Sequence, residues 1–417
     1  MKPLTDPRII LETTVITDLF LKLTAIDTQS DPANSGACPS TAKQLNGQKA
    51  VQEVLQSMGL DDVRLDEHGY LYATLPANTE NPKTIGLIAH IDTAPDYSGA
   101  RVQPRLHRNY DGGDLTLNHG VVISPSDNPE LLQCLGDTII TADGSTLLGA
   151  DDKAGVAEIV AALQYLQAHP EIRRPTIKVA ITPDEEIGHG AARFDVAGFA
   201  GDCAYTLDGG FSGEINGETF SADSAVVTFT GVAVHPGSAF GKMVNALRFA
   251  SRFVTLLPGD EAPETTRERN GFYHPIGMKG NASEAVVTLI LRDFDDLTLA
   301  HRGEQVRALA ARVQAEEPRL KVVVTITQSY RNMGNWLCKR PEVFEILKDA
   351  VKLTGIEPRS VAVRGGTDGS QLTARGLPTP NMFAGGVNAH GPREWVSTRV
   401  MGLAACVVVN LAQRFAQ

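Results

Sequence analysis

Hydrophobic residues recur with helical spacing in some stretches of the first half of the chain and form short continuous runs in others. Apolar residues three and four positions apart predict amphipathic helices at 13–23, 40–58 and 152–168. The continuously apolar runs 84–91 and 176–182 are instead typical of strands covered on both faces. This alternation of strands and helices predicts an α/β fold built on a doubly wound, mixed sheet.

The pattern changes near Phe220. Residues 226–234 and 322–326 alternate Val and Thr, as strands with one solvent-facing side do. Between them the spacing predicts two helices and two further strands, at 244–257, 297–314, 272–279 and 285–292. The resulting βαββαβ order predicts a ferredoxin-like domain over 220–329. The α/β pattern then resumes, so the first domain, 1–219 and 330–417, is predicted to be split around the second.

Composition narrows the class of protein. The 417 residues carry a net charge of −11 and no basic run, which argues against nucleic-acid binding. No stretch approaches the roughly 20 apolar residues of a membrane span, and the first residues lack the apolar core of a signal peptide. The five cysteines are scattered and form no CxxC, which favours reduced thiols over a disulfide framework or a thiolate zinc site. A cytoplasmic enzyme is expected.

Five short segments place a His or an acidic residue at or just after a strand-like run. In doubly wound sheets ligands gather at the carboxyl ends of the strands, so these side chains are expected to converge. One metal ion rarely needs so many donors, whereas two ions that share a carboxylate do, and such a pair can turn water into a nucleophile. The candidates are His90, Asp92, Asp151, Asp152, Glu185, Glu186, Asp208 and His390.

Spacing suggests how some candidates divide the work. His90 and Asp92 are two apart and share one face of a strand end, so Asp92 can fix the ring of a metal-bound His90. By itself a His at a strand end is more often a structural or surface residue than a metal ligand. Asp152 stands where a helix opens and can serve as its N-cap, while a carboxylate at Asp151 can bridge two cations.

The remaining candidates need positive charge nearby or an unusual backbone. Glu185 and Glu186 are adjacent acids directly after a buried strand, so one can bind metal while the other acts as a base toward bound water. The residues alone do not say which glutamate is the base. Asp208 ends the strand of YTLDGG, and His390 lies in a loop flanked by glycines that permit unusual backbone angles.

Longer motifs carry a resemblance that runs nearly from end to end. They include LLGADDKAGVAEI, TPDEEIGHGA, HPGSAFGKMVNAL, GFYHPIGMKG, RGGTDG and GLPTPN. In order and spacing they resemble the di-zinc family of aminopeptidases, carboxypeptidases and aminoacylases, and within it the tripeptide aminopeptidases. About the first ten residues look additional. Two segments, VNAHGPREW and the SAFGK after HPG, depart from the usual sequence of this family. These departures remove no ligand but can alter the shape of the pocket.

The resemblance implies a role for each matching position. Asp151 would bridge two zinc ions, Asp92 would orient a ligand and Glu185 would be the general base. His235 would stabilise the oxyanion from a neighbouring subunit, although HPG alone is also compatible with an ordinary turn. The other zinc ligands would be His90, Asp208, Glu186 and His390, and the substrate would be held by Arg292, Arg364 and Asn381. Both arginines could equally form surface ion pairs.

The implied activity is release of the N-terminal residue from short peptides, above all tripeptides. Two Zn²⁺ per subunit would serve it, with Co²⁺ or Mn²⁺ as substitutes, in a homodimer formed through a lid domain at 220–329. Another amide hydrolase of the family, a dipeptidase or an N-acyl amino acid deacylase, is the alternative. A silent peptide- or metal-binding protein is disfavoured, because a binder has no use for Glu185.

Overall fold

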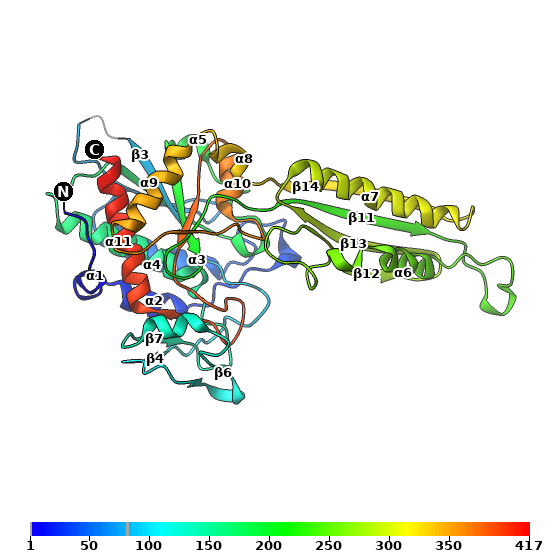
Figure 1. Ribbon diagram of the computed structural model, residues 1–417, viewed down its shortest axis with the longest axis horizontal. Helices are drawn as coiled ribbons and strands as arrows, with labels where there is room; N and C mark the ends of the chain where they lie inside the picture. The colour runs from blue at the N-terminus through cyan, green and yellow to red at the C-terminus, as the bar shows by residue number, and fades with distance from the viewer. Residues whose placement is uncertain (1, 81–82) are drawn as a thin grey trace. The chain divides into compact units, whose positions relative to one another are not determined.

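The computed structural model describes residues 2–80 and 83–417, which form two compact units (Figure 1). The first comprises the chain up to Gly217 together with Trp336–Val361 and Thr367–Gln417. The second comprises Glu218–Asn335 and Ala362–Gly366. The sequence predicts that 1–219 and 330–417 form the first domain, whereas residues 218–219, 330–335 and the short segment Ala362–Gly366 group with the second unit.

An eight-stranded mixed sheet forms the centre of the first unit. Strands β8, β3, β9 and β16 are neighbours and run parallel, so their carboxyl ends meet at one edge. The flanking strands β2 and β10 are antiparallel to them. In sheet order the strands are β1 (Asp61–Leu65), β2 (Leu71–Leu75), β8 (Thr176–Thr182), β3 (Thr84–His90), β9 (Cys203–Gly209), β16 (Asn381–Phe383), β10 (Glu214–Asn216) and β15 (Arg359–Ser360).

Helices cover both faces of this sheet. Leu87 and Val179 belong to a large apolar cluster on one face, and Ile88 and Ala180, the next residues along, belong to a smaller cluster on the other. The larger cluster takes residues from α1 (Pro7–Thr13), α2 (Ile16–Thr24), α3 (Gln44–Ser57), α4 (Ala150–Ala168), α9 (Pro341–Lys352) and α11 (Thr398–Phe415). The smaller takes residues from α5 (Val196–Phe199) and α10 (Asp368–Ala374). The predicted doubly wound α/β fold is confirmed.

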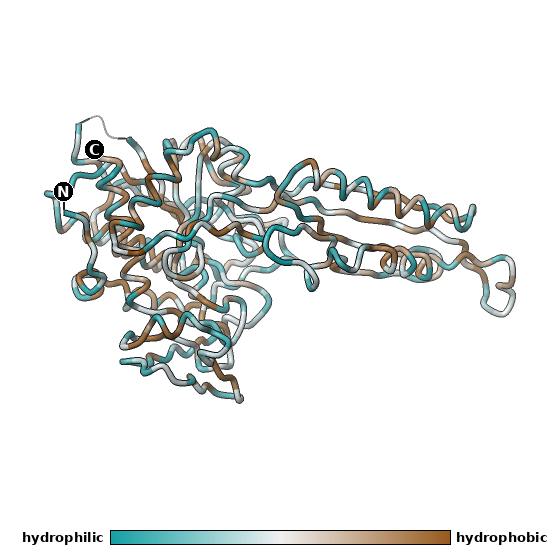
Figure 2. The backbone as a smooth tube through the Cα atoms, viewed as in Figure 1, coloured by the Kyte–Doolittle hydropathy of each residue, from teal (hydrophilic) through white to brown (hydrophobic). Residues whose placement is uncertain are grey.

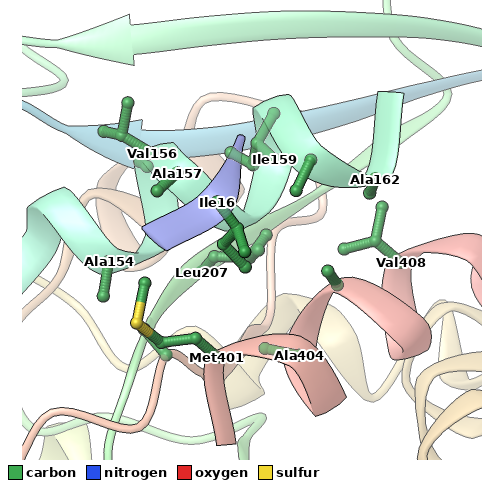
Figure 3. Packing of buried hydrophobic residues seen from close by; sticks show 14 of the residues in the cluster. Ile16, Ala154, Val156, Ala157, Ile159, Ala162, Leu207, Met401, Ala404 and Val408 are labelled. Atoms are coloured by element: carbon green, nitrogen blue, oxygen red, sulfur yellow. The ribbon is translucent and has the colours of Figure 1, made fainter. Parts of the chain in front are cut away.

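Helix α11 packs against α4 in the middle of the larger cluster (Figure 3). Met401, Ala404 and Val408 of α11 share this cluster with Ala154 and the following apolar residues of α4. Every residue of α11 from Val400 to Gln413 is buried, so the helix is covered on all sides, and most of these residues are apolar.

The N-terminal residues that looked additional in the sequence pack against α11. Asp6 accepts the N–H of Arg8 as the N-cap of α1, and Ile10 is completely buried. The backbone N–H of Leu4 donates to Oδ1 of Asn410 at 2.8 Å. The sequence predicted one helix over 13–23, whereas α1 ends at Thr13 and α2 begins at Ile16.

Two small sheets complete the first unit, and periodicity predicted neither, because their strands are only two or three residues long. Strand β7 pairs with β4 and β17, and β5 pairs with β6. The strands are β4 (Arg105–His107), β5 (Leu115–Thr116), β6 (Val122–Ile123), β7 (Ile139–Thr141) and β17 (Trp395–Ser397). The short helix α8 (Gly334–Leu337) begins where the chain leaves the second unit.

The second unit is a four-stranded antiparallel sheet with two helices on one face. Ala225, Val227 and Phe229 of β11 are buried under the helices, whereas Val226 between them is exposed. Along α7 hydrophobic and hydrophilic residues alternate (Figure 2), as expected for a helix with one buried face. In chain order the elements are β11 (Ser221–Thr230), α6 (Ala246–Leu256), β12 (Phe272–Gly280), β13 (Glu284–Asp293), α7 (Asp296–Ala315) and β14 (Lys321–Tyr330).

The strand order β12-β13-β11-β14 is that of a ferredoxin-like βαββαβ unit, so this part of the fold prediction is also confirmed. Strand β11 begins five residues before the predicted start at 226 and ends at Thr230 rather than at 234. In the described part of the chain, no helix is both long and apolar enough to cross a membrane.

Candidate active site

The carboxyl ends of the parallel strands deliver three of the predicted ligands. His90 is the last residue of β3 and lies beside Thr182, the last residue of β8. Glu185 and Glu186 occupy a short 3-10 turn just after β8, and Asp208 is the sixth residue of β9. Because these strands are neighbours, the side chains meet above one edge of the sheet.

Asp151 lies between the two histidines. His90 Nε2 is 3.0 Å from Oδ1 of Asp151, and His390 Nε2 is 3.6 Å from Oδ2. The same nitrogen of His90 is 3.7 Å from Oδ1 of Asp208, while that of His390 is 2.8 Å from Oε2 of Glu186. The five side chains therefore form two groups that share one carboxylate. His390 reaches its place from a left-handed backbone, with φ of 64°.

Asp92 lies under the cluster and is completely buried. Its Oδ1 is 3.4 Å from Nδ1 of His90, the ring nitrogen that faces away from Asp151. The two carboxylate oxygens also accept the backbone N–H groups of Glu185, at 3.0 Å, and Glu186, at 3.2 Å. One carboxylate thus holds both a ring and the turn that carries the glutamates.

A second buried carboxylate, Asp184, fixes the other side of that turn. It adopts a left-handed φ of 59° and accepts hydrogen bonds from the backbone N–H of Ser40 at 2.7 Å and from the Gln44 side chain at 2.6 Å. The hydroxyl of Ser40 donates to it as well. Sequence reasoning missed this role, for which the only local signal was an acid directly before the Glu pair.

Glu394 fixes the segment that carries Asp151, and sequence reasoning missed it too. Its Oε2 accepts the N–H groups of Leu148 at 2.7 Å and Gly149 at 2.8 Å, and its Oε1 accepts that of Asp151 at 3.0 Å. The side chain is buried, and burial raises its pKa to about 7. The one available signal was an acid four residues after His390, in PREW.

Asp152 has the structural role that its position allowed. One carboxylate oxygen accepts the N–H of Gly155 at 3.2 Å, an N-capping contact, and the other accepts the N–H of His90 at 3.2 Å. The backbone of Asp151 and Asp152 is not helical, so the regular part of α4 begins at Lys153.

The electrostatics of the cluster call for bound cations. Burial, followed by the charge of Asp151, raises the pKa of Glu186 to about 8, and burial raises that of Asp208 to about 6. Hydrogen bonds to Asp151 and Glu186 raise the pKa of His390 to about 11. Burial opposes ionisation of Asp151, but its hydrogen bonds to His390 and His90 outweigh this and lower its pKa. Burial of several ionised carboxylates together costs a large free energy unless positive charge lies among them.

The donor set fits metal ions. Ligand atoms of His90, Asp151 and Glu186 lie within 4.8 Å of one another, as do those of His90, Glu185 and Asp208. Oε1 of Glu186 is buried with no hydrogen-bond partner in the described chain, so it can take a ligand other than a protein group. Imidazole nitrogens and carboxylate oxygens are donors suited to Zn²⁺ and related divalent ions.

Three further predicted site residues lie in the second unit. His235 is exposed, and its Nδ1 accepts the N–H of Gly237 at 3.1 Å. The guanidinium of Arg292 lies 4.8 Å from the centre of the Tyr330 ring, and burial lowers its pKa. The guanidinium of Arg364 instead donates to the backbone oxygens of Glu268 and Asn270 within its own unit.

Asn381 lies at the start of β16 in the first unit and is buried. Its Oδ1 accepts the hydroxyl of Thr206, on the neighbouring strand, and that of Thr367 at 3.4 Å. Its Nδ2 has no hydrogen-bond partner in the described part of the chain. The structure therefore does not place Asn381 among the metal-ligand candidates.

Comparison with known proteins identifies the family that has this interrupted α/β unit and its two imidazole–carboxylate groups. Residues 143–414 match the model of Peptidase family M20/M25/M40. The chain is 46% identical to "Peptidase T" of Geobacillus sp. (strain WCH70) over 405 residues, which are 96% of this chain and 98% of that protein. Over 403 residues, again 96% of this chain and 98% of the relative, it is 47% identical to "Peptidase T" of Shouchella clausii.

Solved structures agree with this result. Aminopeptidase PepT from Bacillus cereus superposes with a TM-score of 0.74 at 22% identity and covers 96% of this chain and 98% of its own. A tripeptidase from Staphylococcus aureus gives a TM-score of 0.76 at 21% identity with the same coverage. A Bacillus subtilis protein described as a dinuclear metal binding peptidase from M20 family gives 0.65 at 14% identity, over 95% of this chain and 96% of its own.

The chain belongs to Peptidase family M20/M25/M40 and is a peptide hydrolase. The resemblance derived from its motifs is confirmed.

Proposed function

We propose that the chain is a two-metal aminopeptidase that releases the N-terminal residue of short peptides, above all of tripeptides. The observation that carries the proposal is the position of Asp151, which offers one oxygen to His90 and the other to His390. One carboxylate shared by two donor groups is what a pair of ions requires.

His90 and Asp208 would hold one ion, Glu186 and His390 the other, and Asp151 both. We propose Zn²⁺, for which imidazole and carboxylate are suitable ligands; Co²⁺ or Mn²⁺ would satisfy the same donors. Bound there, the ions would lower the pKa of water and polarise the scissile carbonyl. Asp92 would keep His90 in the orientation and tautomer that binding needs.

Glu185 would act as the base. Its backbone is fixed by Asp92, and its carboxylate reaches the group formed with His90 and Asp208 without being needed by the second group. Burial and the nearby charge of Asp208 raise its pKa, which suits a residue that must both take and return a proton. It would accept a proton from the attacking water and deliver it to the leaving amine.

Substrate length would be set in the second unit. Arg292 is proposed to pair with the far carboxylate of the peptide, since a guanidinium binds a carboxylate bidentately. Arg364 is the weaker candidate, because three of the five N–H groups of its guanidinium already donate within its own unit. Asn381 is proposed to offer a further hydrogen bond through its unpartnered Nδ2. The relatives described as an aminopeptidase and a tripeptidase support this length and direction.

His235 is proposed to stabilise the oxyanion in the active site of a neighbouring subunit, within a homodimer joined through the 220–329 domain. The support is that His235 belongs to the second unit, whereas every metal-ligand candidate belongs to the first. A cytoplasmic location is proposed because the five cysteines are scattered along the chain and form no CxxC motif, and because Cys38, Cys134, Cys203 and Cys406 are free thiols, as expected where the surroundings are reducing.

A peptide panel tests the function. The metal-loaded protein is assayed on Ala-Ala, Ala-Ala-Ala, tetra-alanine, N-acetylated Ala-Ala-Ala and an N-acetyl amino acid, and the products are identified. We expect Ala-Ala-Ala to be cleaved fastest, with release of the first residue and loss of the reaction on N-acetylation. Fastest hydrolysis of Ala-Ala would indicate a dipeptidase, and that of the acetylated amino acid a deacylase.

A further inference from the structure

A cavity of about 230 Å³ lies beside the shared carboxylate. Asp151 and Asp208 line it on the side of the metal-ligand candidates. Most of the remaining wall consists of residues with a small side chain or none, namely Ala150, Ala384, Gly386, Ala389, Gly209 and Gly210. None of the described residues around it is a Lys, an Arg or a His.

The position of the base indicates which end of the substrate lies there. Glu185 must be within hydrogen-bond reach of the leaving amine, so the residues after the scissile bond lie next to Glu185. Neither Glu185 nor Glu186 lines the cavity, whereas Asp151 and Asp208 do. The cavity is therefore on the side of the acyl group, which in an aminopeptidase belongs to the N-terminal residue.

We propose that this cavity, with Gly386 and Ala389 in its wall, is the specificity pocket for the side chain of the N-terminal residue. This rests on the proposed aminopeptidase function. A cavity of about 150 Å³ can enclose benzene, so the volume here admits neutral side chains up to the aromatic ones. No Lys, Arg or His in the described wall can pair with an acidic side chain, so Asp-Ala-Ala is expected to be a poorer substrate than Asn-Ala-Ala.

Gly386 offers a clean way to narrow the pocket. A Cβ built there lies 3.6 Å from Cβ of Ala150 and 3.9 Å from the backbone nitrogen of Asp151, both ordinary van der Waals contacts. The backbone of Gly386 is outside the left-handed region, so alanine fits without strain. The added methyl group takes up space at the pocket wall.

The test compares Phe-Ala-Ala, Ala-Phe-Ala and Ala-Ala-Ala with the metal-loaded wild type and Gly386→Ala. The ratio of kcat/KM for Phe-Ala-Ala over Ala-Ala-Ala is expected to fall about tenfold or more in the variant, because a pocket discriminates by about this factor per misplaced methylene. The ratio for Ala-Phe-Ala over Ala-Ala-Ala is expected to stay unchanged. The control is Gly36→Ala, an exposed position with nothing within 4 Å of the new Cβ, which should keep both ratios.

A uniform loss on all three peptides, or a loss confined to Ala-Phe-Ala, would overturn the assignment of the pocket. If Gly386→Ala does not fold, Ala389→Val enlarges an exposed wall residue and serves the same comparison. Calorimetry of the binding of phenylalanine amide and alanine amide measures the affinity of the pocket for each side chain without turnover. If the wild type cleaves no tripeptide but Gly386→Ala weakens the binding of phenylalanine amide, the proposed function is rejected and the pocket is kept. If Gly386→Ala changes neither the kcat/KM ratio for Phe-Ala-Ala nor the binding of phenylalanine amide, the pocket is rejected.

Discussion

Glu394 offers a sharp test of how the site is held together. Its carboxylate is buried and accepts three backbone N–H groups, two on Oε2 and one on Oε1. The third belongs to Asp151, the shared ligand. Replacing Glu394 by Gln keeps the shape of the side chain but turns one of the two acceptor atoms into a donor.

The magnitude follows from those contacts. The better orientation of the amide keeps its oxygen on Leu148 and Gly149 and turns its NH₂ toward the N–H of Asp151. One hydrogen bond to a charged acceptor, about 1.5–3 kcal/mol, is then lost, and two become neutral at a cost of about 1 kcal/mol each. Because burial raises the pKa of Glu394, removal of its buried charge offsets part of this loss, and we expect Glu394→Gln to lower the free energy of unfolding by at most about 3–5 kcal/mol. Because Asp151 is no longer held, metal affinity should also fall about 10- to 100-fold.

Urea unfolding of the metal-free protein and metal titration against a competing chelator measure the two effects. Both are done near pH 8, above the pKa of about 7 of Glu394, so that the carboxylate is charged. The matched control is Glu158→Gln in α4. Glu158 is equally buried, but neither of its oxygens has a partner in the described part of the chain. If both variants changed stability and metal affinity by the same amount, the contacts to the 148–151 segment would not be what holds Asp151.

Glu185→Gln is expected to keep both metal ions and lose several orders of magnitude in turnover, whereas Asp151→Asn should lose metal, because a neutral amide bridges two cations poorly. Metal analysis beside kinetics separates the two effects. Near-normal turnover of Glu185→Gln would refute its role as the base. His235→Ala should lower turnover about 100- to 1000-fold with metal content unchanged. If His235 acts between subunits, mixing this variant with Glu185→Gln under proven subunit exchange should restore activity. A mixture that stays inactive would mean that His235 acts on the site of its own chain or has no role in catalysis. Burial raises the pKa of Glu158 well above its ordinary value of 4.5, so the folded state binds the proton more tightly and stability should fall as pH rises above about 4.5, by up to about 1.4 kcal/mol per pH unit. Glu158→Gln should remove that part of the slope in urea titrations between pH 5 and 7, and a slope equal to that of the wild type would contradict it.

The parts of the fold that the sequence predicted are those with a long apolar run or with apolar residues at helical spacing. The run 84–91 became β3 and the stripe at 152–168 became α4, because each buries enough apolar surface to fix its own conformation. Strands β4, β7 and β17 are three residues long and too short to show a period. Helix α1 was missed although Asp6 and Pro7 are an N-cap and a first-turn proline, since the apolar spacing nearby fitted one helix starting at 13.

Most candidate ligands could be predicted because they lie at or just after the end of a strand-like run or at the start of a helix, and His390 because glycines flank its loop. Glu394 and Asp184 could not, because a carboxylate that accepts backbone N–H groups leaves no local pattern. The partners of Glu394 are 243 to 246 residues away in the chain, and the Ser40 that binds Asp184 is 144 residues away. Only the folded structure brings these groups together.

The carboxylates that hold the site share one physical device. Asp92, Asp184 and Glu394 are all buried and accept backbone N–H groups. Asp92 and Glu394 accept those of segments that carry candidate ligands, and Asp184, which directly precedes the two glutamates, accepts that of Ser40. Such hydrogen bonds stabilise the charged form of a carboxylate without adding a cation. The scaffold thus adds negative charge around the ligands, and the buried Lys153, which interacts electrostatically with Glu394 and Asp92, offsets only part of it. Divalent ions would neutralise the remaining negative charge of this cluster. The hydrogen bonds from backbone N–H groups to the buried carboxylates, which position the metal donors, therefore also favour metal binding.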